Sequence, residues 1–103
     1  MDTNARVAFT VQQTELFVSW RRRLRDVKAR AAIVRRLDRI SAGLLGDWKS
    51  VGDGVSELRI DIGPGYRLYY TIRGRTIVIL LCGGEKRTQA ADIRAARKLA
   101  KEV

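Results

Sequence analysis

The fold is decided by residues 55–73, VSELRIDIGPGYRLYYTIR, which hold two strand patterns joined by a turn. Val55–Ile62 and Tyr66–Arg73 alternate their side chains with period two, so each run presents two different faces. The intervening Gly63–Gly65, with proline in the middle, fits a tight turn of type II. The stretch therefore predicts an antiparallel hairpin.

Further strands are expected on both sides of this hairpin. Residues 48–51 precede it across a turn at Gly52–Gly54, and residues 76–82 follow it. Turn signals at such regular spacing are typical of an antiparallel meander. The run at 76–82 is apolar on both faces, which indicates a central, buried strand. We expect Gly83-Gly84 to end it.

Helical spacing appears on either side of the predicted meander. Apolar residues recur at this spacing over residues 16–24 and 33–44, and Thr14 can cap the first of these helices. We expect the turn between the two helices near Asp26–Ala29. Thr88 can cap a final helix at residues 89–100.

The alternation of Val7, Phe9 and Val11 predicts a short first strand, which makes the element order β-α-α-β-β-β-β-α. Strands grouped after helices indicate an α+β fold. We expect one domain over residues 1–103, with an N-terminal strand and a helical hairpin packed on a mainly antiparallel twisted sheet, and a C-terminal helix. All helices are expected on one face of that sheet.

Composition excludes several classes of function. The 103 residues include 21 Lys and Arg against 11 Asp and Glu, a net charge of +10, and no histidine. Without histidine, and with Cys82 as its one cysteine, the chain cannot use imidazole chemistry or form a typical zinc site, so no metal or cofactor is expected. No apolar run has membrane-spanning length, and neither a secretory signal nor a disulfide pair is present, so we expect a cytoplasmic protein without membrane contact.

The positive charge predicts a polyanionic or acidic partner. Sixteen of the basic residues are arginine, which binds phosphate in a bidentate manner, although a GC-rich genome would give the same excess. The arginines of the predicted helices are either solvated or in contact with nucleic acid. The candidates for nucleic-acid contact are Arg22, Arg25, Arg36, Arg73 and Arg87.

Strand alternation places a group of polar side chains on one face of the predicted sheet. Glu57, Arg59, Arg67 and Tyr69 share that face, and Lys49 and Lys86 can border it. Arginine could hold a phosphodiester there while lysine, glutamate or tyrosine transfers protons. The alternative is a set of ordinary solvated strand residues in cross-strand Glu–Arg pairs. The segment Gly83–Gln89 adds a candidate anion site, where two glycines precede a helix N-terminus.

Short motifs follow one another in a fixed order from about residue 7 to residue 100. They are Phe17-x-x-Trp20-x-x-x-Leu24-Arg25-Asp26, Arg39-Ile40, Gly46-Asp47-Trp48-Lys49, Gly54-Val55-x-Glu57-Leu58-Arg59-Ile60, Gly63-Pro64-Gly65-Tyr66-Arg67-Leu68-Tyr69-Tyr70 and Leu80-Leu81-Cys82-Gly83-Gly84-x-Lys86-x-x-Gln89-x-x-Asp92-Ile93. This ordered set resembles the RelE/ParE toxin superfamily, specifically its HigB-like, phage-derived branch of addiction module killer proteins.

The resemblance implies the toxin of a bacterial type II toxin–antitoxin pair. Its cognate antitoxin would be a small DNA-binding protein of helix-turn-helix type, through which alone the toxin reaches operator DNA. RelE-like toxins cut mRNA on the ribosome with sheet-borne lysine and arginine, without metal or cofactor. Carried onto this chain, the base candidates are Lys49 and Glu57, the phosphate stabilisers Arg59 and Arg67, and the acid candidates Tyr69 and Lys86.

Three functions remain open at this stage. The first is a ribosome-dependent mRNA endonuclease that inhibits translation. The second is a ParE-like inhibitor of DNA gyrase with no chemistry of its own, and the third is an inactive toxin fold that only binds its antitoxin. The cluster of lysine, arginines and tyrosine on the sheet favours the nuclease, because a gyrase inhibitor needs no such set. The acid–base scheme of histidine-containing HigB proteins cannot apply to a chain without histidine.

Overall fold

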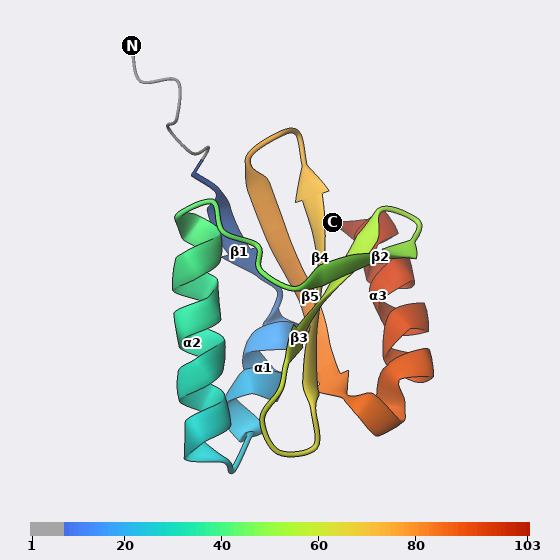
Figure 1. Cartoon of the computed structure of the whole chain (residues 1–103). Helices are drawn as coiled ribbons and strands as arrows, with labels where there is room; N and C mark the ends of the chain where they lie inside the picture. Colours follow the sequence, from blue (N-terminus) through green and yellow to red (C-terminus); the bar gives the residue numbers. More distant parts are fainter. Residues whose placement is uncertain (1–7) are drawn as a thin grey trace.

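The computed structural model describes residues 8–103 and forms a five-stranded sheet flanked by helices (Figure 1). In chain order the elements are β1 (Thr10–Gln13), α1 (Glu15–Arg23), α2 (Val27–Ser41), β2 (Trp48–Gly52), β3 (Val55–Ile60), β4 (Tyr66–Arg73), β5 (Ile77–Glu85), the 3-10 turn η1 (Lys86–Thr88) and α3 (Gln89–Glu102). Within residues 8–103, none of the helices has the length and apolarity to cross a bilayer.

The sheet has the strand order β1-β5-β4-β3-β2. β2 to β5 form an antiparallel meander, and β1 joins it in parallel beside β5. The expected α+β class, the mainly antiparallel sheet and the central position of the last strand are confirmed. β5 is central because β1 and β4 both pair with it.

Helices cover both faces of the sheet, which corrects the expectation of a single helical layer. α1 and α2 pack on one face and α3 on the opposite one, as Figure 1 shows at the left and right of the strands. The physical reason lies in the strands. Strand residues such as Val55, Ile79 and Leu81 form a second apolar surface, and α3 buries it with Ala96 and Ala100.

Two helix starts are fixed by side-chain caps. The Thr14 hydroxyl accepts a hydrogen bond of 3.1 Å from Phe17 N, as predicted. The Asp26 carboxylate accepts one of 3.1 Å from Ala29 N, so Asp26 is the N-cap of α2. The turn between the helices therefore lies before Val27, earlier than expected from the sequence.

Two strand boundaries also differ from the prediction. β1 is observed at Thr10–Gln13, and Val7, which was expected to begin it, lies outside the described residues. Gly83 and Gly84 do not end the last strand, because β5 continues to Glu85 and these glycines pair with Leu68 and Arg67.

Candidate functional site

Glu57 lies at the centre of a polar cluster on the face of the sheet that α3 covers. Its neighbours in the register are Lys49 on β2 and Tyr69 on β4, while Arg67 lies two residues from Tyr69 on the same face. The Glu57 side chain is completely buried. Strand alternation correctly predicted which residues share this face. Their burial came from α3 and was not predicted.

The two carboxylate oxygens of Glu57 have different surroundings. Arg67 Nε lies 3.0 Å from Oε1, but its N–H is not directed at that oxygen, so the contact is an ion pair without a hydrogen bond. Tyr69 Oη donates to Oε1 at 3.5 Å. Lys49 Nζ lies 3.6 Å from Oε2, which has no hydrogen-bond partner. Oε1 therefore has Arg67 and Tyr69 beside it, whereas Oε2 has Lys49.

The best hydrogen bond to Glu57 comes from a residue that the sequence analysis did not assign to the site. Gln89 Nε2 donates to Glu57 Oε1 at 2.8 Å. Gln89 is the first residue of α3 and lies 32 positions further along the chain. Its presence in the last family motif was the available signal, but only the packing of α3 brings it to the sheet.

Tyr69 lies beneath α3 with no exposed surface. Burial, and then the nearby Glu57 carboxylate, raise the pKa of its phenol strongly. The hydroxyl therefore stays protonated over the physiological pH range and serves Glu57 as a hydrogen-bond donor.

The remaining predicted site residues lie at the edge of this cluster. Arg59 is opposite Arg67 in the register, and its Nε pairs with Asp47 at 3.5 Å. Because like charges directly opposite one another repel, each of these arginines has its own carboxylate. Lys86 Cβ and Arg67 Nη1 lie 3.8 and 3.9 Å from the point that a Gly65 side chain would occupy. Lys86 is exposed, as are half of Lys49 and nearly half of Arg59.

The site is thus a buried anionic centre with cations at its edge. Glu57, Arg67 and Tyr69 form the interior together with the part-buried Gln89. Lys49, Lys86 and Arg59 reach solvent, as does the Asp47 carboxylate that pairs with Arg59. Such an arrangement suits a phosphodiester, whose charge the outer cations can bind while the inner network fixes their positions.

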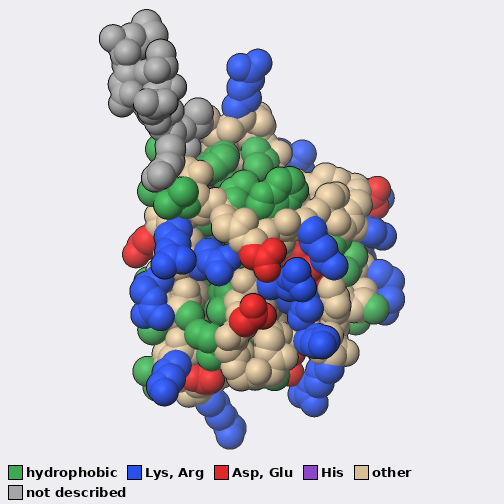
Figure 2. Space-filling view, in the orientation of Figure 1, with side chains coloured by type: hydrophobic (Ala, Val, Ile, Leu, Met, Phe, Trp, Pro, Cys, Tyr) green, Lys and Arg blue, Asp and Glu red, His purple; other side chains and the backbone are tan. Residues whose placement is uncertain are grey.

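The five arginines predicted to contact nucleic acid do not form one cluster. Arg73 and Arg87 lie towards opposite ends of β4: Arg73 donates to the backbone oxygens of Ala100 and Val103, and Arg87 pairs with Glu85 at 2.9 Å. Arg36 lies against Gly46, where its Nη1 is buried without a hydrogen-bond partner. Arg22 and Arg25 are exposed at the end of α1. Figure 2 likewise shows lysine and arginine spread over the visible face.

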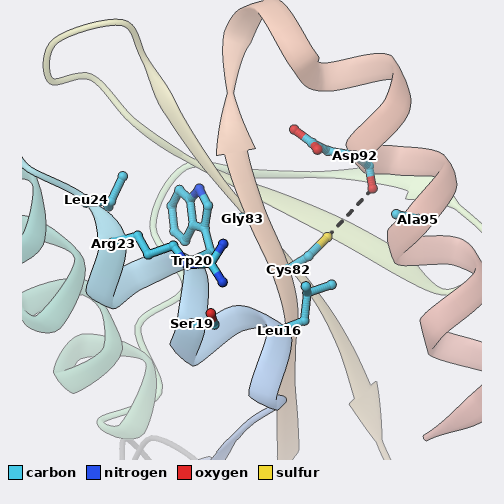
Figure 3. A pocket seen from close by; sticks show the side chains of 9 residues that line it. All are labelled: Leu16, Ser19, Trp20, Arg23, Leu24, Cys82, Gly83, Asp92 and Ala95. Carbon is cyan, nitrogen blue, oxygen red and sulfur yellow. Dashed lines mark hydrogen bonds between the residues drawn. The ribbon is translucent and has the colours of Figure 1, made fainter.

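The glycine pair before η1 serves packing. A side chain at Gly83 would overlap the Trp20 ring, and one at Gly84 would overlap the Asp92 carboxylate. Trp20 and Asp92 also line an apolar groove of about 320 Å³ between α1 and α3, in which Cys82 Sγ donates to the Asp92 carbonyl at 3.7 Å (Figure 3). These side chains occupy the space that the sequence analysis left for an anion.

No group of three or more carboxylate, thiol or imidazole side chains within residues 8–103 could hold a metal ion. The fold is similar to that of a solved bacterial protein. A double mutant of the Escherichia coli toxin RelE in its free state superposes with a TM-score of 0.69 at 17% sequence identity, and the match covers 94% of this chain and 99% of RelE.

Sequence comparison shows the family of the chain. The model of the family described as phage derived protein Gp49-like matches residues 23–102. An uncharacterized protein of Haemophilus influenzae is 47% identical over 93 residues, which cover 90% of this chain and 94% of that protein. The chain belongs to the Gp49-like family and has the RelE-like toxin fold.

Proposed function

We propose that this protein is the toxin of a type II toxin–antitoxin pair and that it cuts mRNA on the ribosome. The observation that carries the proposal is the buried Glu57 network with Lys49, Arg59 and Lys86 at its edge. Burying a carboxylate and a guanidinium is costly, and an apolar core of similar volume is often at least as stable. A small domain that keeps such a network uses it for more than stability.

The reaction is attack of a ribose 2′-oxygen on the adjacent phosphorus. The bond from O2′ to phosphorus forms, the bond from phosphorus to O5′ breaks, and one proton moves from O2′ to O5′ overall. Lys49 Nζ, 3.6 Å from Glu57 Oε2, first passes a proton of its ammonium group to that carboxylate, and the neutral amine then takes the proton from O2′. Arg59 stabilises the charged transition state at the edge of the site, and Arg67, which is buried beside Glu57, adds its positive charge from the interior.

The proton for the leaving 5′-oxygen comes from Lys86 in this proposal. Lys86 is exposed and close to Arg67, whereas Tyr69, the other acid candidate, is fully buried and donates to Glu57. The cognate antitoxin, of helix-turn-helix type, would offer an acidic surface to this strongly basic protein.

The test adds purified protein to a translating bacterial extract and maps the 5′ ends of a reporter message. Wild-type protein should produce new ends only on translated message. Lys49→Gln should reduce cleavage by about a hundredfold, the lower range for loss of a general acid–base group. Lys49 is half exposed, so this change leaves the buried part of the network in place.

The matched control is Lys101→Gln, which removes the same charge from an exposed position in the last turn of α3. It should cut message like the wild type. Intact message beside wild-type protein would overturn the nuclease. A supercoiling assay with DNA gyrase would then test the ParE-like alternative.

A further inference from the structure

Among the hydrogen bonds and ion pairs of the described residues, the one from Gln89 alone joins Glu57 to a helix. The other three partners, Lys49, Arg67 and Tyr69, come from β2 and β4 of the same sheet. Gln89 also makes the shortest hydrogen bond to the carboxylate, 2.8 Å against 3.5 Å for Tyr69. The orientation of the carboxylate therefore depends on where α3 places this one amide.

Gln89 is held in position by hydrogen bonds that anchor α3 at its start and in its C-terminal half. At its start, Thr88 Oγ1 donates to Asp92 Oδ2 at 2.6 Å and accepts from Glu85 N at 3.3 Å. Further along, Arg97 Nε donates to Val51 O at 2.9 Å and so fastens the helix to β2. A donor carried by a fixed helix holds its acceptor more firmly than one on a free loop.

The amide is also chemically suited to hold a carboxylate without competing for it. It donates a hydrogen bond, carries no charge and does not ionise near neutral pH. By holding Oε1, it leaves Oε2 turned toward Lys49 Nζ, 3.6 Å away. A carboxylate free to rotate about its Cγ–Cδ bond would not keep an oxygen directed at Lys49 Nζ.

We propose that Gln89 is a positioning residue. It fixes the Glu57 carboxylate so that Oε2 stays directed at Lys49 Nζ and can accept its proton. Its effect on cleavage rests on the proposed nuclease function. The hydrogen bond itself does not, so the two can be tested separately.

The test compares Gln89→Met, which keeps the length and loses the donor, with Gln89→Glu, which keeps the shape and places a second carboxyl group against Glu57. In ribosome-dependent cleavage, both should lower kcat by about tenfold or more while KM stays within about twofold, because positioning acts on the chemical step. Gln12→Met, at an exposed residue of β1, is the matched control and should leave both constants unchanged.

A second readout does not need activity. The chain has four glutamates, so the ¹³C carboxyl signal of Glu57 can be assigned by its loss in Glu57→Gln. That signal should shift in Gln89→Met and stay in place in Gln12→Met. An unchanged Glu57 signal in Gln89→Met, or Gln89→Met cleaving at the wild-type rate, would overturn the proposal. If wild-type protein cuts no message, the nuclease function fails, and the carboxyl signal alone decides whether Gln89 holds Glu57.

Discussion

At the residue scale, the sequence predicted on which face of the sheet Glu57 lies but did not predict that it is buried. The alternation of β3 put Glu57 and Arg59 on the same face, and the register confirms it. Yet Glu57 has no exposed surface, while 44% of the Arg59 side chain is exposed. The two residues lie two positions apart on one strand. Their exposure differs because α3 covers Glu57 but does not extend over Arg59.

Cys82 gives a residue-scale prediction for alkaline pH. Burial, and then the Asp92 carboxylate, raise the pKa of its thiol from 9.0 to about 12. Between these values the unfolded chain has lost the thiol proton and the folded protein keeps it, so the unfolded state binds fewer protons. The free energy of unfolding must then fall as pH rises from 9, by up to about 1.4 kcal/mol per pH unit for this group.

Urea unfolding of wild type and Cys82→Ala at pH 8, 9 and 10 measures this effect. Tyrosines whose pKa values are also raised are present in both proteins, so their contributions cancel in the difference. The wild type should lose stability more steeply above pH 9. Parallel stability curves would contradict the assigned environment of Cys82.

At the scale of elements, β5 is the strand on which the two helical layers meet. Its register against β4 shifts after Tyr69, and Leu81 and Cys82 both pack on the α3 side. The bulge reverses the alternation, so that Gly83 faces Trp20 of α1 and Gly84 faces Asp92 of α3. The alternation of residues in a sequence does not reveal a β-bulge. The sequence therefore did not show that Gly83 and Gly84 face packed side chains, and we predicted an anion site there.

Gly83→Ala tests this packing. The added methyl group would overlap the six-membered part of the Trp20 indole, and overpacking of this kind costs about 1–3 kcal/mol or more. A Trp20→Phe background lacks the benzo ring that carries Cε3 and Cζ3, the two atoms with the closest overlap, so the same substitution should cost clearly less. Chemical denaturation of the four proteins of this cycle gives the coupling. Equal costs in both backgrounds would show that Gly83 is not needed to accommodate Trp20.

At the scale of the whole molecule, charge and packing are separated. The two apolar clusters and the Glu57 carboxylate lie inside. Lysine and arginine side chains, which give the chain its net charge of +10, are spread over the face seen in Figure 2. Interactions between exposed charges are screened by salt, and those of buried groups much less so. Salt should therefore weaken binding to RNA long before it weakens the fold.

Sedimentation with bacterial ribosomes measures this difference. If three phosphates are contacted, raising the salt fourfold should weaken binding by at least about tenfold. Thermal unfolding over the same range of salt is the control and should change little. Ribosome binding that is independent of salt would indicate that the surface charge serves another partner, such as an acidic antitoxin.

The sequence alone determined the kind and order of the elements, because capping, turns and strand alternation are local. Thr14 caps α1, the hairpins form where glycines allow them, and Lys49, Glu57, Arg67 and Tyr69 share a face. These features depend on neighbours in the chain or on adjacent strands.

The tertiary structure decided what covers that face. Alternation says which residues lie together, but not whether a helix or solvent lies over them. α3 packs on the second apolar face, buries Glu57 and brings Gln89 to it from 32 positions away. Burial of an apolar surface that belongs to several strands at once drives this packing, and no local pattern encodes it.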